Sequence, residues 1–229
     1  SIKNLLQNKG LINYSSITPS VASTISQKLD ANIFIYGNIN QAGNTIRVNA
    51  QVINSKTEES FKSFQLEGKG ENMLPIIDSL SVLIKNFLII SELKKDLPDY
   101  IGHNVSTGSP DALRYFIYGR NEFSKGDFLS ALNWLYKAVS IDSNFFDAIT
   151  LISSANGNEG KYDEAKKWAL KAYKQRDQVP VLQQIKANRV YATYFETPRE
   201  VIKYLKQQLD YDDQNPAALS SLGNEYSQL

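Results

Sequence analysis

The pattern of apolar and polar positions divides the chain into a first part that mixes strand and helix signals and a second part that is helical throughout. Across residues 20–29 apolar side chains recur on one helical face, after Thr18 and Pro19, a pair that suits a helix N-terminus. Residues 33–36 are β-branched or aromatic, and residues 46–52 alternate apolar with polar. These patterns predict a short helix followed by a β-hairpin with one buried face.

Two further elements complete the first part. Phe64 and Leu66 alternate with polar residues, which predicts a third strand and, because the strands are close in sequence, an antiparallel meander. From Met73 the apolar period becomes helical, and charged residues recur every seven positions from Asp78 to Glu92 on the opposite face. We expect a long helix that covers the sheet.

A break in composition follows this long helix. Residues 98–110 contain two prolines and two glycines with Ser and Thr between them, which is typical of a linker. The predicted organisation is therefore an α+β domain in residues 1–97, with a small antiparallel sheet and packed helices, and an all-α domain in residues 111–229.

The second part repeats with a period of 34 residues. Gly126 matches Gly160 and Trp134 matches Trp168 at this spacing. Four more pairs share it: Phe128 with Tyr162, Ala131 with Ala165, Lys137 with Lys171, and Ala138 with Ala172. Alanine lets antiparallel helices approach closely, and glycine lets the chain reverse between them. The period is that of the tetratricopeptide repeat (TPR).

Other positions extend this resemblance. The residues that match first-helix and second-helix packing positions of the first unit are Tyr115, Tyr118, Gly119, Ala131, Leu135 and Ala138. The resemblance implies an all-α superhelix with repeats at about 112–145, 146–179 and 180–215, and the first helix of a fourth at 216–229. We expect a longer turn between the helices of the third unit, near Thr197 and Pro198.

The first part resembles a second family. Residues 29–39, then Gly43, then residues 46–54 with the phrase Ile-Arg-Val-Asn-Ala-Gln-Val, are similar to the TolB-like amino-terminal domain of bacterial signalling and regulatory proteins. Members of that group often follow a membrane anchor and an upstream kinase, cyclase or DNA-binding domain. The resemblance implies a periplasmic or otherwise extracytoplasmic location, tethered through an upstream segment, with a cytoplasmic location as the alternative.

Composition argues against several classes of function. The 25 basic and 24 acidic residues nearly cancel, which disfavours nucleic acid as a partner. Cysteine is absent and His103 is the single histidine, so thiol nucleophiles and His-based metal sites are not expected. The apolar stretch at 73–93 is interrupted by Asp78 and Lys85, so we expect no direct membrane insertion within the chain. We predict no enzymatic activity, cofactor or metal.

Two remaining clusters have ordinary interpretations. Asp210, Asp212 and Asp213 could ligate a hard cation, but they lack the glycine and distal glutamate of an EF-hand loop, which favours a surface turn. The glycines at 68 and 70 flank a lysine, yet a phosphate-binding loop needs four residues between its glycines.

The predicted binding surface is the concave face that the first helices of tetratricopeptide arrays form. Repeat register assigns to it Phe116, Arg120, Phe123, Thr150, Ser154, Asn158, Gln184, Asn188, Tyr191, Ser220 and Asn224. Amides, hydroxyls and a few aromatics suit an extended protein or peptide segment. The alternative is that Phe116 and Phe123 pack internally. No cluster of several Lys or Arg is apparent, so capture of a chain-end carboxylate is not supported.

A structural role is the competing prediction. The fourth unit ends after one helix, and an unpaired helix could take a partner from a second chain. This would make the chain a homo-oligomer through its terminal repeat, without a separate ligand.

Overall fold

The computed structural model describes residues 18–98, 102 and 105–227. The chain forms two compact units, residues 1–87 and 88–229, and each is described by itself below. A small antiparallel sheet with helices in the first unit and helices throughout the second confirm the predicted α+β start and the helical region after it. The division falls within helix α3 (Met73–Leu93), while the domain boundary expected after residue 97 stays a prediction.

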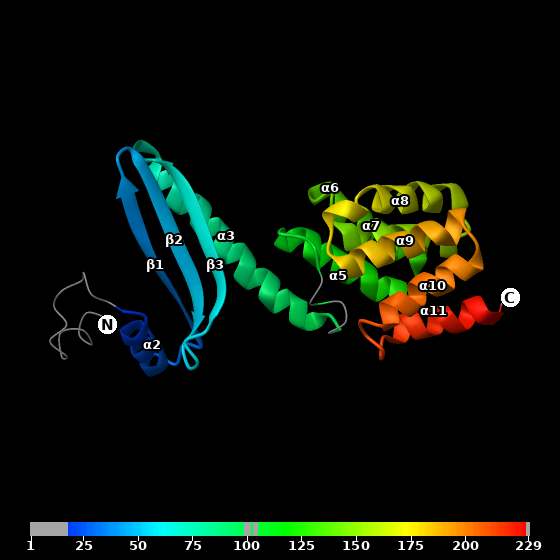
Figure 1. Cartoon of the computed structure of the whole chain (residues 1–229), viewed down its shortest axis with the longest axis horizontal. Helices are drawn as coiled ribbons and strands as arrows, with labels where there is room; N and C mark the ends of the chain where they lie inside the picture. The colour runs from blue at the N-terminus through cyan, green and yellow to red at the C-terminus, as the bar shows by residue number, and fades with distance from the viewer. Residues whose placement is uncertain (1–17, 99–101, 103–104, 228–229) are drawn as a thin grey trace. The chain divides into compact units, whose positions relative to one another are not determined.

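The sheet of the first unit has three antiparallel strands in sequence order, as predicted (Figure 1). They are β1 (Ile33–Ala42), β2 (Thr45–Asn54) and β3 (Ser60–Lys69). Gly43 begins the two-residue turn between β1 and β2 with φ of +59°, a left-handed conformation that glycine adopts without steric cost.

Helix α3 covers one face of this sheet. Alternate residues of β2 are buried beneath it: Ile46, Val48, Ala50 and Val52. Phe64 of β3 makes an edge-to-face contact with Phe87 of α3, with ring centroids 5.8 Å apart. At Gly68 an added Cβ would lie 2.6 Å from Ile76 Cδ1, so glycine lets the helix lie close to the strand. The predicted long helix and its packing are confirmed.

Helix α2 (Pro19–Lys28) begins and packs through short polar side chains. The Thr18 hydroxyl accepts a hydrogen bond from the Val21 amide at 3.4 Å and caps the helix. Buried Ser23 donates to the Ser55 carbonyl at 2.8 Å, and Gln27 donates to the same oxygen. These bonds tie α2 to the turn that follows β2.

Among the described residues, the stretch Gly70–Asp96 is one helical segment long and apolar enough to cross a membrane, by length and composition alone. In the first unit, its Ile76, Leu80 and Ile84 side chains are buried. Part of its apolar surface therefore packs on the sheet. The expected lack of membrane insertion stays a prediction.

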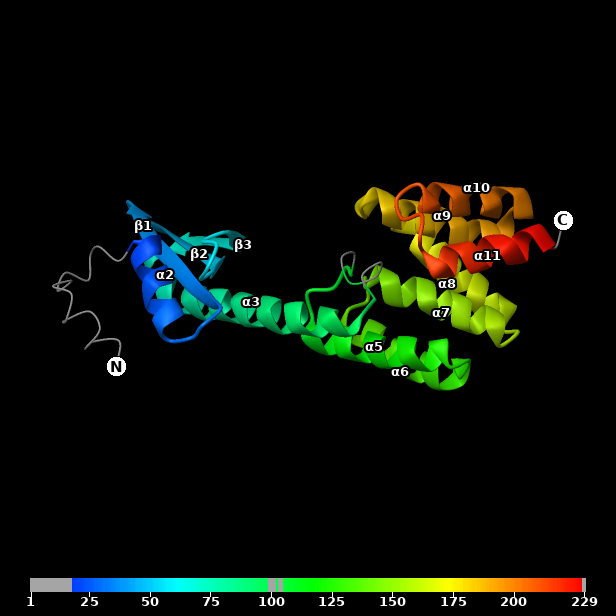
Figure 2. The same cartoon turned by 90° about the horizontal axis from the view of Figure 1, so that it is seen from below.

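The second unit consists of helices that pack in consecutive pairs (Figures 1 and 2). The helices are α5 (Pro110–Ser124), α6 (Phe128–Ile141), α7 (Phe146–Asn158), α8 (Tyr162–Lys174), α9 (Val181–Phe195), α10 (Pro198–Leu209) and α11 (Pro216–Ser227). Helix α5 pairs with α6, α7 with α8 and α9 with α10, and α11 packs on α10. The first helices also touch one another, α5 with α7 and α7 with α9.

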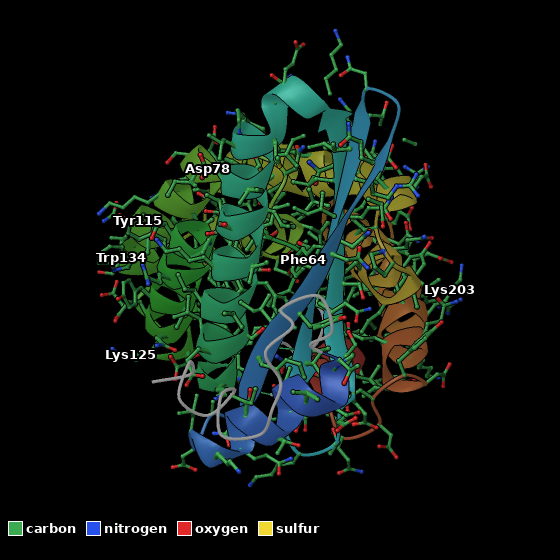
Figure 3. All side chains as sticks on the ribbon, turned by 90° about the vertical axis from the view of Figure 1, so that its left-hand side faces the viewer. Phe64, Asp78, Tyr115, Lys125, Trp134 and Lys203 are labelled. Atoms are coloured by element: carbon green, nitrogen blue, oxygen red, sulfur yellow. The ribbon has the colours of Figure 1, made fainter. Side chains whose placement is uncertain are left out.

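Residues 34 positions apart have equivalent roles in the first two hairpins. Gly126 and Gly160 end the inter-helix turns with φ of +83° and +73°. The alanines at the repeat positions are completely buried: Ala131, Ala138, Ala165 and Ala172. A lysine lies over a tryptophan ring in both hairpins, with Nζ 4.2 Å from the Trp134 centroid and 4.9 Å from the Trp168 centroid. Tyr115 stacks on Trp134, and both are labelled in Figure 3.

The third hairpin is out of register with the first two because a connection is longer. Residues 142–145 join α6 to α7, whereas residues 175–180, with the short helix η4 (Arg176–Gln178), join α8 to α9. The two additional residues displace every position of α9 along the sequence. The expectation of a longer turn near Thr197 and Pro198 is wrong, since only residues 196–197 separate α9 from α10.

Residues 105–109 are hydrogen-bonded to the second hairpin. Thr107 Oγ1 donates to Asp142 Oδ2 at 2.7 Å, and Thr107 is buried. The Ser106 amide and hydroxyl both donate to Asp147 Oδ2. This end of the predicted linker therefore packs as part of the second unit.

Replacement of Gly119 should test the close helix approach in the first hairpin. In Gly119→Ala the new Cβ would lie 2.7 Å from Leu135 Cγ and 3.1 Å from the Ala131 carbonyl oxygen. We expect a loss of about 1–3 kcal/mol in the free energy of unfolding from overpacking. Both tryptophans, at 134 and 168, belong to the second unit, so urea unfolding followed by tryptophan fluorescence reports on it.

Gly223→Ala is the matched control, because no described atom lies within 4 Å of the Cβ it would add in α11. Its better helix propensity should leave stability unchanged or raise it by up to about 1 kcal/mol. Equal effects of the two substitutions would contradict the packing argument.

Candidate functional site

The inner faces of the first helices enclose a pocket of about 260 Å³, here called the inner pocket. Helices α5, α7 and α9 form most of its wall, and α10, α11 and the loop between them close it. Its lining residues are Phe116, Arg120, Phe123, Ser124, Asp147, Thr150, Leu151, Ser154, Lys186, Arg189, Gln208, Asn215 and Ala217. Aromatic rings thus share one pocket with three cationic side chains.

A second pocket of about 680 Å³, here called the distal pocket, lies along α7, α8 and α9. It is lined by Ser154, Gly157, Asn158, Tyr162, Lys166, Arg189, Val190, Thr193 and Tyr194. The Tyr194 hydroxyl donates to the Ser153 carbonyl at 3.2 Å, and a Cβ at Gly157 would collide with it. Ser154 and Arg189 line both pockets, so the two pockets adjoin at these side chains, and together they are called the groove.

The structure brings together the predicted residues of the first two repeats, which form the hairpins α5–α6 and α7–α8. Phe116, Arg120, Phe123, Thr150 and Ser154 line the inner pocket, and Asn158 with Ser154 lines the distal pocket. Their shared surface follows from the 34-residue register, since the register holds across both hairpins.

The predicted residues of the later helices lie elsewhere. Gln184 donates to the Val179 carbonyl at 3.0 Å, and Tyr191 stacks between Tyr173 and Phe195 at centroid distances of 4.2 and 4.6 Å. Asn188 lines neither pocket. Ser220 and Asn224 are exposed on α11 and also lie outside the two pockets.

The two-residue displacement of α9 explains which residues replace them. Lys186 occupies the place expected for Gln184, and Arg189, Val190 and Thr193 face the distal pocket. The expectation that no cluster of basic residues lines the groove is therefore wrong, because Arg120, Lys186 and Arg189 share the inner pocket. The sequence signal was a 36-residue spacing from Ala165 to Val201, which indicates two additional residues but not the connection that holds them.

The predicted aromatic residues have both of the roles considered for them. Phe116 is 3% exposed and contacts Phe145, with ring centroids 5.0 Å apart. Phe123 contacts Phe128 edge-to-face at 5.1 Å. Both phenylalanines also line the inner pocket, so packed core side chains form its apolar wall.

Asp147 is a buried carboxylate in this pocket, and hydrogen bonds support it. Ser106 donates to Asp147 Oδ2 from its amide at 3.2 Å and from its hydroxyl at 3.1 Å, and Gln183 Nε2 lies 3.5 Å away. Burial raises the pKa of Asp147 above its ordinary value, although Lys186 and Ser106 act in the opposite direction.

Lys186 and Arg189 are partly buried cations on the pocket walls. Burial lowers the pKa of each side chain, most strongly opposed by Asp147 at Lys186 and by Tyr194 at Arg189. Arg189 Nε is closed to solvent and has no hydrogen-bond partner among the described residues. A buried guanidinium N–H without an acceptor is costly, which makes this position receptive to an anionic ligand group.

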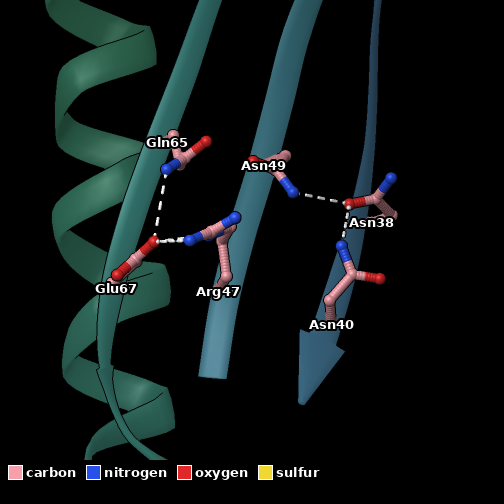
Figure 4. A network of polar contacts seen from close by, with 6 residues as sticks. All are labelled: Asn38, Asn40, Arg47, Asn49, Gln65 and Glu67. Carbon is pink, nitrogen blue, oxygen red and sulfur yellow. Dashed lines mark hydrogen bonds and ion pairs between the residues drawn. The ribbon is translucent and has the colours of Figure 1, made fainter. Parts of the chain in front are cut away.

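The uncovered face of the sheet in the first unit carries a separate polar network (Figure 4). Arg47 pairs with Glu67, which also accepts from Gln65 at 3.4 Å. Asn49 and Asn40 both donate to Asn38 Oδ1, at 2.8 and 3.3 Å. The amide groups can hydrogen-bond a ligand, but these side chains are exposed and largely satisfy one another.

No three His, Asp or Glu side chains in the described part of the chain lie close enough to hold a metal ion. Asp212 accepts a hydrogen bond from Asn215 at 3.1 Å, as expected for a turn residue. His103 and the sequence around it at 103–104 lie outside the described residues.

Comparison with known proteins adds no family assignment. No protein-family model matches the chain, and no curated protein matches it significantly. The functional argument therefore depends on the groove and its residues.

Replacement of Ser106 should test the environment of Asp147. A carboxyl whose pKa is raised by folding holds its proton more tightly when folded, so the unfolding free energy falls as pH rises toward the folded-state pKa. The Ser106 donors favour the ionised form and limit this fall. Ser106→Ala should cost about 1–3 kcal/mol, and the cost should grow with rising pH.

Urea unfolding of the full chain at several pH values, followed by tryptophan fluorescence, measures this dependence. Ser140→Ala is the control, because its hydroxyl donates only to the Lys137 carbonyl on an exposed surface, at 2.8 Å. Its effect should be small and independent of pH. A loss in Ser106→Ala that is constant with pH would contradict the assigned role.

Proposed function

We propose that the second unit is a tetratricopeptide-type array that binds an extended segment of a protein or peptide partner, without catalysis. The observation that carries the proposal is the pair of adjoining pockets, inner and distal, which share Ser154 and Arg189. Extended segments need both hydrogen-bonding groups for their backbone and pockets for their side chains. Hydroxyl, amide, aromatic and cationic groups along this groove offer both.

The assignment to tetratricopeptide repeats is supported by equivalences between the first two hairpins. Positive φ at Gly126 and Gly160, buried alanines on facing helices, and a lysine over each tryptophan all recur at 34 residues. First helices that lie next to one another, α5 with α7 and α7 with α9, are what an array with an inner face requires.

For the first unit we propose a TolB-like domain in an extracytoplasmic sensory or scaffolding protein. The support is the sequence resemblance together with a three-stranded meander covered by α3. A cytoplasmic location is the alternative.

Peptides selected from a display library against the full chain provide the test. Ser154→Tyr places a large side chain where the two pockets join, and should weaken the selected peptides about tenfold or more because it removes the space they occupy. Fluorescence anisotropy with the labelled peptides measures the dissociation constants.

Ser140→Tyr makes the same change on the exposed surface of α6 and should leave binding unchanged. Selection of no peptide, or equal binding to both tyrosine variants, would contradict binding in the groove.

Self-assembly through α11 is the second candidate. Ala218 is the buried residue of this helix, whereas Leu219 and Tyr226 are 47% and 50% exposed. A second copy could cover these apolar side chains. Sedimentation velocity at several concentrations tests self-assembly, since a strict monomer excludes this role.

A further inference from the structure

Two cations stand at the junction of the inner and distal pockets without an anionic partner in contact. Arg189 lines both pockets, and Lys186, one turn earlier on α9, lines the inner one. Neither side chain makes an ion pair or hydrogen bond with any described residue. Buried charges in proteins are normally paired, because the desolvation of an unpaired charge is expensive.

The acidic side chains nearby do not fill this role. Asp147 influences Lys186 electrostatically, but its carboxylate accepts from the Ser106 amide and hydroxyl. Asp212 acts on Lys186 and Glu225 acts on Arg189, each more weakly and without an ion pair. Tyr194, which lines the distal pocket, remains neutral near neutral pH because burial raises its pKa.

We propose that Lys186 and Arg189 bind the carboxylate of an aspartate or glutamate side chain within the extended segment that occupies the groove. This inference rests on the proposed function and adds a chemical class of ligand to it. Arg189, which lines both pockets, can offer its terminal N–H groups to both oxygens of one carboxylate, a bidentate geometry in which guanidinium groups bind strongly.

The adjacency of the two pockets favours an internal residue over a chain end. Because Ser154 and Arg189 line both pockets, a segment that fills them passes Arg189 and continues on either side. A carboxylate held there belongs to a side chain in the middle of the segment.

The surrounding charges favour one negative charge over a phosphate or a polyanion. Asp147, Asp212 and Glu225 lie near enough to affect Lys186 or Arg189, and they would repel additional negative charge. The chain as a whole carries a net charge of only +1. A single carboxylate balances the two cations without exceeding what these neighbours tolerate.

The apolar wall of the inner pocket predicts the neighbour of the acidic residue. Phe116, Phe123 and Leu151 line the same pocket as Lys186 and Arg189. A leucine or phenylalanine next to the acidic residue would bury its side chain against them. The predicted ligand motif is therefore an acidic residue adjacent to an apolar one.

The experiment compares matched synthetic peptides on the full chain. An array of N-acetylated, C-amidated peptides with a central Leu-Glu and varied flanks is tested beside the same peptides with Leu-Gln and beside neutral peptides with a free C-terminal carboxylate. Anisotropy titrations should show Leu-Glu peptides binding about tenfold or more tightly than their Leu-Gln counterparts. This comparison uses the unaltered protein, so it does not depend on how a variant folds.

Variants then locate the carboxylate. Lys186→Met and Arg189→Met should each weaken the Leu-Glu peptides about tenfold or more and reduce the preference for Glu over Gln. Lys167→Met is the control, since Lys167 is an exposed cation on α8 that pairs with Glu164 at 3.4 Å, and it should change neither quantity. Tryptophan fluorescence confirms that each variant is folded.

The possible outcomes separate the two proposals. Equal binding of Glu and Gln peptides overturns the carboxylate site and leaves the groove intact. Tighter binding that depends only on a free C-terminus overturns the internal position. If no peptide binds, acidic or neutral, both the carboxylate site and the proposed function fail.

Discussion

The close approach of helices within each hairpin is the constraint on which the second unit depends. Ala131 and Ala165 are completely buried between paired helices, and Gly119 leaves room for Leu135 where any side chain would collide with it. Small residues at these contacts let the paired helices pack closely. The face of α5, α7 and α9 that is not used in closing is thereby turned toward the groove.

Polar groups occupy that groove at a cost to stability which packing must offset. Asp147, Lys186 and Arg189 all have pKa values displaced by burial in the direction of the neutral form. Replacement of such groups by apolar residues is often neutral or stabilising in other proteins, so their presence needs a reason other than fold stability. Recognition of a charged ligand is a reason that accounts for all three at one place.

Much of this architecture follows from sequence periodicity, and the exceptions have a common origin. Alternation in β2 and the helical period from Met73 predicted the sheet and α3, because each pattern reflects burial of one face. The 34-residue spacing predicted Thr150 and Ser154 on one inner surface, and both line the inner pocket. It failed on α9, because periodicity within helices carries no information on the length of the connection at 175–180.

The wrong register predicted for α9 concerned the residues that give the inner pocket most of its positive charge. A shift of two positions replaces Gln184 by Lys186 and Asn188 by Val190, and Arg189, beside Val190, lines both pockets. A groove that holds an unsatisfied guanidinium is less stable than it would be with an acceptor bound, so any ligand supplying the carboxylate also stabilises the folded unit. The desolvation that makes the two cations costly would also strengthen their attraction for one negative charge, since both effects arise from the exclusion of water. Stability and specificity are thus linked through the position of two side chains on α9.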